Sequence, residues 1–231
     1  MIISFVNPKG GVDKSTLTLT TATSRAVVDR FKSPCMIELD PQGTLKSWFN
    51  ERQNKKNNFT FYQLLETDIN ILAEELEKIR QKHDIIFIDT LGESTAKTIT
   101  QFILAVSNKI IIPIRTSIND EQSFEQHLLP FIEHMFIQTD TQPYKFFILP
   151  IRVLPQTKAE NVIGYFKSIM PEFIKCLPVV FRTRNIFENF GREGLTLNEY
   201  AKSVETKKKD SEQVEKAILN VEEIANTIIN I

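Results

Sequence analysis

Short apolar runs recur along the chain and alternate with longer segments whose apolar residues have helical spacing. The runs cover residues 2–6, 35–39, 85–88, 110–114, 146–149 and 177–181. They are nearly continuous rather than alternating, which is typical of strands buried on both faces of a sheet. The intervening helical segments cover residues 15–31, 69–81, 93–106, 120–138 and 158–170. This order predicts an α/β fold, with a mostly parallel twisted sheet and helices on both faces.

Two further segments bear on the organisation of the chain. The polar stretch 50–58 is predicted to be a surface loop. Segment 211–229 has apolar residues at helical spacing and glutamates on its polar face, which anionic lipid would repel. We therefore expect this helix to dock onto the protein rather than onto a membrane. Because no repeat or Gly/Ser linker interrupts the sequence, residues 1–231 are expected to form one domain.

The composition excludes several classes of protein. A hydrophobic fraction of 42% with 17 phenylalanines indicates a packed core and argues against intrinsic disorder. Lys and Arg number 28 against 29 Asp and Glu, so no global positive field attracts nucleic acid or acidic lipid. Cys35 and Cys176 lack the paired spacing of a structural zinc site and fit a reducing cytosol. The N-terminus has no basic region of a signal peptide, so a cytoplasmic protein is expected.

The first predicted strand is followed at once by residues 7–16, NPKGGVDKST, and then by a helical pattern. Such a turn binds phosphate, because successive main-chain amides and the helix N-terminus supply partial positive charge. Lys14 adds a full charge, and the Ser15 hydroxyl can bind Mg²⁺. The predicted phosphate-binding residues are Gly10, Gly11, Val12, Asp13, Lys14, Ser15 and Thr16. The pattern predicts a nucleotide site rather than a plain structural turn.

Asp13 departs from this pattern, because a phosphate-binding loop normally has glycine before its lysine. The position requires a close approach of the backbone to phosphate, although Asp tolerates a left-handed conformation better than most residues. A carboxylate about 4 Å from a phosphate oxygen would cost on the order of 4 kcal/mol, roughly a thousandfold in affinity. Asp13 is therefore expected to impair nucleotide binding. Three explanations stay open: an engineered or selected loss of function, a natural pseudo-ATPase, or a loop in which Asp13 points away or is neutralised by Mg²⁺.

Lys9, directly before the glycine pair, is the mark of the deviant Walker A loop, and here the chain resembles the ParA/MinD superfamily of P-loop ATPases. Residues 35–42 (CMIELDPQ) resemble the second strand of that family, and residues 85–89 its Walker B strand. Segments 109–120, 184–187 and 194–199 extend the resemblance to most of the chain, with spacing similar to small ParF-type plasmid partition proteins. Glu38, where the family usually has Asp, and the absence of proline in 90–92 are departures.

The resemblance implies that ATP or ADP and Mg²⁺ are the cofactors. Lys14 would contact the β- and γ-phosphates, while Ser15 and Asp89 would hold the metal. Asp40 would help to bind the metal and would orient the attacking water. Lys9 would reach across a sandwich homodimer to the nucleotide of the partner, so that ATP joins the subunits. Asp40 and Asp89 could instead cap helices, but the carboxyl edge of an open α/β sheet is where ligands bind.

The implied function is a ParA-like ATPase for plasmid or chromosome partition, which would associate with the nucleoid. The ATP-bound homodimer would bind DNA non-specifically, and a ParB-like centromere-binding adaptor would stimulate hydrolysis. Arg184, with Arg152 and Phe187, could lie near adenine or at the subunit interface. The candidate DNA contacts, which could equally be a solvated surface, are Arg182, Arg184, Arg192, Lys202, Lys207, Lys208 and Lys209.

Two other functions remain open at the level of sequence. One is an interaction module of ParA fold in which Asp13 has abolished control by nucleotide. The other is a VirC-type ATPase in conjugative DNA processing, suggested by residues 177–180. Measurable ATPase activity and ATP-dependent retention of DNA would separate the partition ATPase from the nucleotide-independent module.

Overall fold

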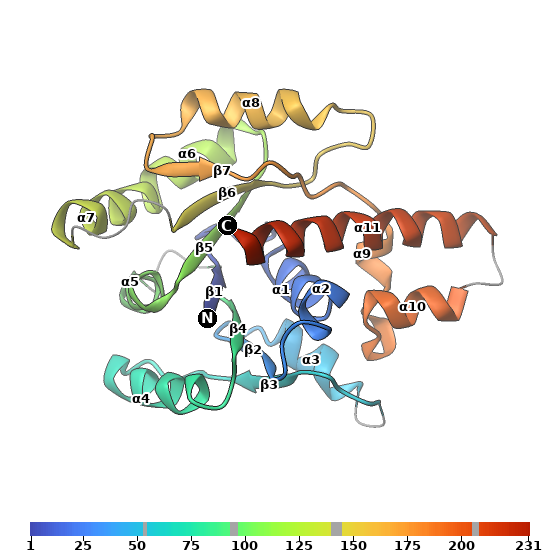
Figure 1. Ribbon diagram of the computed structural model, residues 1–231. Helices are drawn as coiled ribbons and strands as arrows, with labels where there is room; N and C mark the ends of the chain where they lie inside the picture. Colours follow the sequence, from blue (N-terminus) through green and yellow to red (C-terminus); the bar gives the residue numbers. More distant parts are fainter. Residues whose placement is uncertain (53–54, 93–96, 140–144, 205–207) are drawn as a thin grey trace.

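A computed structural model describes residues 1–52, 55–92, 97–139, 145–204 and 208–231. In this part of the chain seven strands form one parallel sheet with the order β3-β2-β4-β1-β5-β6-β7 (Figure 1). The strands are β1 (Ile2–Phe5), β2 (Pro34–Glu38), β3 (Thr60–Gln63), β4 (Ile85–Asp89), β5 (Lys109–Ile114), β6 (Phe146–Pro150) and β7 (Ile174–Cys176). The predicted α/β fold with a parallel sheet is thus confirmed.

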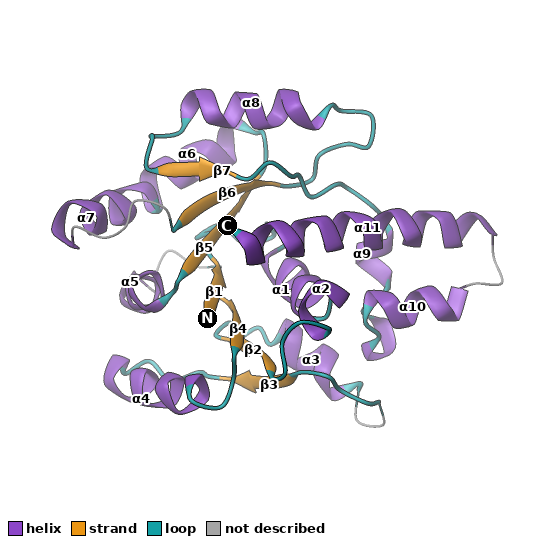
Figure 2. Ribbon diagram, viewed as in Figure 1, coloured by secondary structure: helices purple, strands orange, loops and turns teal. Residues whose placement is uncertain are grey.

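Helices cover both faces of the sheet (Figure 2). One face packs against α1 (Lys14–Ala22), α2 (Arg25–Val28), α3 (Thr44–Asn50), α9 (Ile186–Asn189), the 3₁₀ turn Arg192–Gly194, α10 (Leu197–Val204) and α11 (Lys208–Asn230). The other face packs against α4 (Ile69–Arg80), α5 (Lys97–Val106), α6 (Ile118–His127), α7 (Leu129–Thr139) and α8 (Ala159–Ile169). Because consecutive strand residues face opposite sides, Ile3 and Phe5 enter the first layer of core and Ile2 the second.

The predicted strand at 177–181 is wrong. The last strand of the sheet is Ile174–Cys176, and the chain then runs beside β6 with only scattered main-chain bonds, Leu177 N to Ile148 O and Phe181 N to Pro150 O. Pro178 lies between these two bonds, and proline has no N–H to donate to a ladder. Strand β3 was not predicted, because its short sequence TFYQ is half-buried at the edge of the sheet and carries no continuous apolar run.

Two predicted helices are each divided in two. Segment 15–31 breaks after Ala22, where the Thr23 and Ser24 hydroxyls donate to the carbonyls of Leu19 and Thr21. Such side-chain bonds compete with a regular helix. Segment 120–138 breaks at Leu128, just before Pro130, whose missing N–H cannot continue the helical bonding. Of the predicted helix 93–106, residues 93–96 lie outside the described part of the chain.

Helix α11 docks onto the body of the protein, as predicted. Its buried side chains include Val214, Val221 and Ile228, and they pack in the same core layer as α1 and α2. Lys109 at the start of β5 donates to the carbonyls of Ile228 and Ile229 at the C-terminal end of the helix, at 2.9 and 2.8 Å. Among the described residues no helix combines the length and apolarity needed to cross a membrane.

The predicted surface loop 50–58 is only partly exposed. Arg52 is 1% exposed and forms an ion pair with Glu199 of α10 at 2.6 Å. Its guanidinium also lies over the Trp48 ring, 5.0 Å from the ring centroid. Residues 53–54 of the stretch lie outside the described part of the chain. The buried arginine therefore connects the end of α3 to the C-terminal helices, a contact 147 residues apart in sequence.

Candidate functional site

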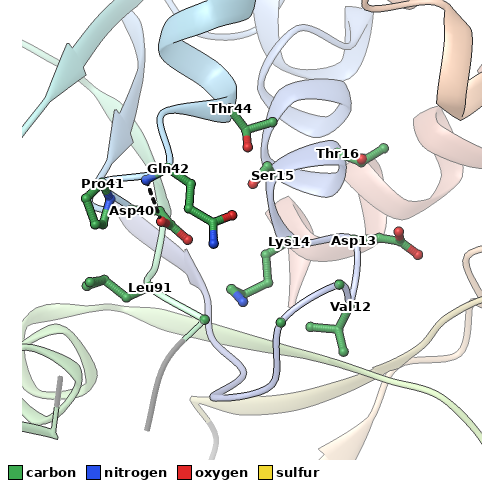
Figure 3. A pocket seen from close by; sticks show the side chains of 13 residues that line it. Val12, Asp13, Lys14, Ser15, Thr16, Asp40, Pro41, Gln42, Thr44 and Leu91 are labelled. Atoms are coloured by element: carbon green, nitrogen blue, oxygen red, sulfur yellow. Dashed lines mark hydrogen bonds between the residues drawn. The ribbon is translucent and has the colours of Figure 1, made fainter. Parts of the chain in front are cut away.

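Loop 7–16 lies at the carboxyl ends of the central strands, where β1 runs into helix α1. It borders a cavity of about 440 Å³ (Figure 3). The ends of β2 and β4 supply the opposite wall, which includes Asp40, Gln42, Leu91 and Gly92. The carboxyl edge of an open parallel sheet is the usual ligand site of such folds. The structure therefore brings together the three motifs that the sequence placed far apart.

The backbone of the loop is fixed at several points. Asn7 donates from its side-chain amide to the Pro113 carbonyl at 2.8 Å and accepts from the Lys9 N–H at 2.9 Å. Gly11 and Asp13 adopt left-handed conformations, with φ of 70° and 57°. Asp13 also begins helix α1, because its carbonyl accepts the first helical bond from Leu17 N at 2.8 Å. The main-chain amides at this helix N-terminus are a suitable partner for an anion.

Lys14 is buried beside the cavity, with 7% of its surface exposed. Its ammonium group donates to the Lys9 carbonyl at 3.3 Å, a long hydrogen bond that leaves most of its donor capacity unused among the described residues. Burial lowers the pKa of Lys14, while Asp89 and Asp40 act in the opposite direction. A buried cation with so few partners is suited to receive an anionic ligand.

Ser15, which lines the cavity, contacts Asp89 at the end of β4. The Ser15 hydroxyl donates to Asp89 Oδ2 at 2.6 Å, and Asp89 is fully buried. Burial raises the pKa of Asp89 to about 7, against the opposing effects of the Ser15 hydrogen bond and Lys14. The second carboxylate oxygen, Oδ1, has no hydrogen-bond partner among the described residues. An unpartnered buried oxygen next to a hydroxyl fits a hard cation such as Mg²⁺.

Asp40 and Gly92 complete the cavity wall. Asp40 is half-exposed, and its side chain accepts from the Gln42 N–H at 2.9 Å (Figure 3). Gly92 lies against the loop so closely that a β-carbon there would come within 3.3 Å of Gly10 Cα and 3.4 Å of Lys14 Nζ. Glycine at position 92 therefore lets the β4 end approach the loop without displacing the Gly10 backbone. Among the described residues no cluster of three or more acidic, His or Cys side chains forms a metal site, so Mg²⁺ would need ligand oxygens as well.

Glu38, a departure from the family pattern, has a structural role. Its buried carboxylate accepts from the main-chain N–H groups of Leu45 and Lys46, at 2.7 and 3.0 Å. Burial raises the pKa of Glu38, although these two hydrogen bonds oppose the shift. The helix they begin, α3, starts after Gly43, which has no side chain to cap it. Glu38 thus caps α3 and fixes the chain that leads away from Asp40.

Asp13 does not point into the cavity. In Figure 3 its side chain leaves the loop in the direction opposite to that of Lys14. Its carboxylate forms a two-point ion pair with Arg152, with Nε–Oδ2 and Nη2–Oδ1 distances of 2.8 and 2.9 Å. The hydrogen bonds that Arg152 donates to Asp13 raise the pKa of Arg152. The expected close repulsion between this carboxylate and a phosphate therefore does not fit the structure, which agrees with the third explanation for Asp13.

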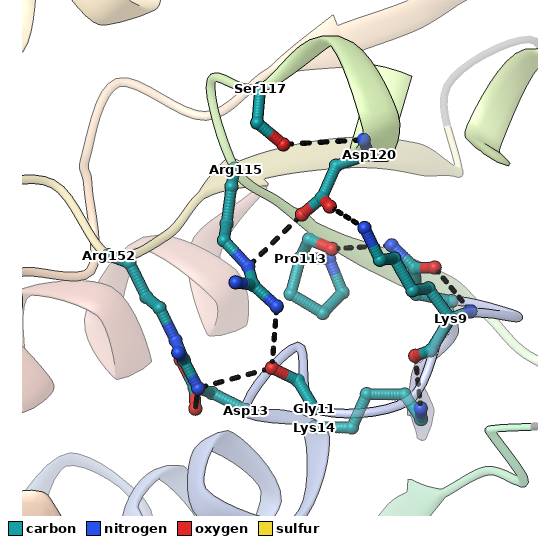
Figure 4. Close-up of polar contacts among 10 residues, drawn as sticks. Lys9, Gly11, Asp13, Lys14, Pro113, Arg115, Ser117, Asp120 and Arg152 are labelled. Atoms are coloured by element: carbon teal, nitrogen blue, oxygen red, sulfur yellow. Dashed lines mark hydrogen bonds and ion pairs between the residues drawn. The ribbon is translucent and has the colours of Figure 1, made fainter. Parts of the chain in front are cut away.

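The outer side of the loop carries a second set of ion pairs (Figure 4). Lys9 forms a close ion pair with Asp120, whose side chain is 1% exposed, and Arg115 Nε lies 3.1 Å from the other oxygen of Asp120. Arg115 and Arg152 also donate to the Gly11 carbonyl, at 3.0 and 3.1 Å. Sequence reasoning did not assign a role to Asp120 or Arg115. Arg115 directly follows β5, and Asp120 lies in the first turn of α6, near the ligand edge of the sheet, where polar residues are informative.

A neighbouring cavity of about 300 Å³ shares Asp13 and Thr16 with the first. It brings together Arg152, Arg184 and Phe187, the three residues that the sequence placed near adenine or at the subunit interface. Burial lowers the pKa of Arg184, with a further contribution from Arg182. The Nε atom of Arg184 is buried and has no hydrogen-bond partner among the described residues. The phosphate loop thus has an aromatic and cationic pocket next to its cavity, on the other side of Asp13 and Thr16.

The candidate DNA contacts do not form a single set. Arg182 donates to the carbonyls of Leu154 and Thr157 at 3.0 Å, which gives it a structural role in holding the loop after β6. Arg192 and Lys202 are exposed. Lys207 lies outside the described part of the chain, and Lys208 and Lys209 form the first turn of α11.

Comparison with known proteins supports the fold. No protein-family model and no curated protein matches the sequence. The structure is similar to a putative plasmid partition protein from Borrelia burgdorferi B31 bound to AMPPNP, with 18% identity, a TM-score of 0.59, and 94% and 97% of the two chains covered.

It is also similar to a ParA family ATPase from Chlorobium tepidum, with 12% identity, a TM-score of 0.63, and coverage of 94% and 98%. The MinC:MinD cell division complex from Aquifex aeolicus matches with 13% identity, a TM-score of 0.63, and 94% of each chain covered. The chain therefore has the fold of the ParA/MinD proteins, as its motifs predicted.

Proposed function

We propose that the protein is a Mg²⁺-dependent ATPase of the ParA type. The observation that carries this proposal is a cavity lined by Lys14 and Ser15, with Asp89 bonded to the Ser15 hydroxyl directly behind it. The Lys14 ammonium group is underused, and the buried Asp89 Oδ1 has no hydrogen-bond partner among the described residues. Similarity to a partition protein bound to AMPPNP supports the choice of an adenine nucleotide. The role follows from the site together with the fold, because a fold alone does not define a function.

Each group has a distinct task in the proposed reaction. The main-chain amides of the loop and the Lys14 ammonium group bind the phosphates and stabilise the charge that develops on them during transfer. Ser15 and Asp89, with Asp40 nearby, would hold Mg²⁺, which neutralises phosphate charge when bound. Asp40 lies at the open side of the cavity, where it can accept a hydrogen bond from a water molecule and orient it. The adjoining pocket with Arg184 and Phe187 receives the base.

Lys9 would act between two copies of the chain. It is paired with Asp120 in the structure, so it must leave this carboxylate before it can reach the nucleotide of a partner. The negative charge of a bound triphosphate supplies a competing attraction. An ATP-dependent homodimer is therefore proposed, with Lys9→Ala expected to remain monomeric in the presence of Mg-ATP when measured by light scattering.

The proposed cellular role is DNA partition. Non-specific DNA binding by the dimer would use exposed basic groups such as Arg192 and Lys202, and a ParB-like centromere-binding adaptor would stimulate hydrolysis. Arg192→Gln with Lys202→Gln should weaken DNA retention severalfold and make it less dependent on salt. Glu212→Lys, which adds a positive charge on an exposed part of α11, serves as a control for net charge alone.

A direct test is the hydrolysis of Mg-ATP by the wild-type protein and by Asp40→Ala. The proposal predicts slow release of phosphate by the wild type, and a loss of at least tenfold in Asp40→Ala with binding retained. Failure of the wild type to bind Mg-ATP would instead support the nucleotide-independent interaction module. Retention of DNA without nucleotide would also support the nucleotide-independent interaction module.

A further inference from the structure

The ion pair between Asp13 and Arg152 lies at the boundary between the two cavities. Asp13 lines both of them, and Arg152 lines the smaller one together with Arg184 and Phe187. The two partners are separated by 139 residues in sequence, so the pair ties the phosphate loop to the end of β6. Whatever holds Arg152 in place therefore shapes the smaller cavity beside the phosphate loop.

Both partners occupy unusual backbone conformations. Asp13 has φ of 57° and Arg152 has φ of 53°, in the left-handed region that non-glycine residues rarely adopt. Arginine gains nothing locally from this conformation, which costs about 1 kcal/mol. Such residues persist where the surroundings hold them, and they gather at ligand clamps. The backbone at Arg152 thus directs its side chain toward the loop at some cost in stability.

The hydrogen bonds of Arg152 leave one side of its guanidinium group free. Nε donates to Asp13 Oδ2, and Nη2 donates to Asp13 Oδ1 and to the Gly11 carbonyl (Figure 4). Nη1 makes no hydrogen bond within the described part of the chain, so both of its N–H groups remain for a ligand. A two-point carboxylate contact fixes the plane of a guanidinium group, which a single contact does not.

We infer that Asp13 is a positioning residue, which holds Arg152 so that it binds the nucleoside part of the ligand. The inference rests on the proposed nucleotide function and explains the carboxylate in the phosphate loop. The smaller cavity offers flat cationic and aromatic groups, Arg152, Arg184 and Phe187, which suit a base and its sugar. Asp13 thus raises the preference for a nucleotide over a bare polyphosphate, at the expense of some attraction for phosphate.

The test compares Mg-ATP with Mg-tripolyphosphate by calorimetry, because tripolyphosphate reaches the larger cavity and has no nucleoside. The preference is the ratio of the two dissociation constants. In Asp13→Asn, which keeps the shape of the side chain, the preference should fall on the order of tenfold, while tripolyphosphate binds equally well or more tightly. Arg152→Gln should lower the preference by a similar factor, and the double variant should lower it no further.

Two further variants serve as controls for folding and for the loss of a surface ion pair. Arg152→Lys keeps the charge without the two-point contact and should lose most of the preference even if Arg152→Gln folds poorly. Glu212→Gln breaks an exposed ion pair with Lys216 in α11 and should leave the preference unchanged. An unchanged preference in Asp13→Asn would overturn the inference, as would Mg-ATP tightening more than tripolyphosphate.

The wild-type protein separates this inference from the proposed function. Binding of tripolyphosphate without any preference for Mg-ATP would overturn the role of Asp13 and leave the phosphate site standing. Binding of neither compound would overturn the proposed function, and the inference with it. A clear preference for Mg-ATP that disappears in Asp13→Asn supports both.

Discussion

The two sides of loop 7–16 differ in how their polar groups are satisfied. On the cavity side, Lys14 makes one long hydrogen bond and Asp89 Oδ1 makes none among the described residues. On the outer side, Asp13 and Asp120 each face a cation, through Arg152 and Lys9. Arg115 Nε and Asp120 Oδ2 on the outer side also lack a hydrogen bond, but they lie 3.1 Å apart as an ion pair. Buried polar groups are normally paired, so the groups without a close partner on the cavity side indicate where a ligand belongs. The cavity side is therefore expected to bind the phosphates, whereas on the outer side the carboxylates of Asp13 and Asp120 hold Arg152 and Lys9 in place.

The largest expected effect is on the cavity side. Lys14→Met should weaken the binding of Mg-ATP by at least about a hundredfold, because it removes the only full positive charge that lines the cavity within the described residues. The free energy of unfolding without ligand should not fall, since burial lowers the pKa of Lys14 and keeping it charged is costly. Calorimetry and urea unfolding measure the two quantities. Lys78→Met, an exposed lysine of α4, is the matched control and should change neither.

On the outer side we expect an effect on the stability of the protein. Asp120→Asn should lower the free energy of unfolding by about 2 kcal/mol, because it leaves Lys9 and Arg115 side by side without a counter-charge. Both cations are about one-third exposed, which reduces the cost below that of a fully buried pair. Urea unfolding of Asp120→Asn, Lys9→Met and the double variant measures this loss of unfolding free energy and the share of it that comes from the Lys9–Asp120 pair. A loss below about 0.5 kcal/mol would show that the outer pairs do not support the loop.

Removal of Mg²⁺ tests whether the carboxylates on the cavity side bind the metal. With EDTA present, ATP should bind roughly tenfold more weakly, because the carboxylates of Asp89 and Asp40 then face the phosphates without a cation between them. Asp89→Asn should be much less sensitive to EDTA. Equal affinity of the wild type with and without Mg²⁺ would exclude Asp89 Oδ1 as a metal-binding atom.

The smallest effect concerns an ion pair far from the loop. Burial raises the pKa of Glu199, but hydrogen bonds from Arg52 and Thr196 outweigh it, so the net pKa is lowered. A lowered pKa stabilises the fold above the unfolded value of about 4.5, and this contribution is lost as the pH falls through the folded value. Glu199→Gln should lower the unfolding free energy by about 1 kcal/mol at pH 7 and by less at pH 3. Thermal unfolding at the two pH values checks it, and an equal loss at both would contradict this linkage.

The sequence predicted the parts of the molecule that depend on local patterns. Five of the buried strands have continuous apolar runs, and loop 7–16 shows its strand, glycines and helix within a few residues. Edge strand β3 has no such run, and Pro178 ends the ladder that the apolar stretch 177–181 suggested. Local periodicity therefore identified the centre of the sheet better than its edges.

The position of the Asp13 side chain could not be predicted in the same way. Its effect on a phosphate depends on Arg152, which lies 139 residues away and has no motif of its own. The Lys9–Asp120 pair spans 111 residues in the same manner. A charge in a binding loop is therefore interpretable only when its partner is known, and the partner comes from the tertiary structure.

The central claim is that the loop binds polyphosphate on one side while its carboxylate is held on the other. Titration of Mg-ATP into the wild-type protein and into Asp13→Gly tests it most directly. We predict that the wild type binds, and that Asp13→Gly binds no more tightly. Absence of binding by the wild type, with affinity gained by roughly a thousandfold in Asp13→Gly, would contradict the account, because it would mean that the carboxylate repels the phosphates after all.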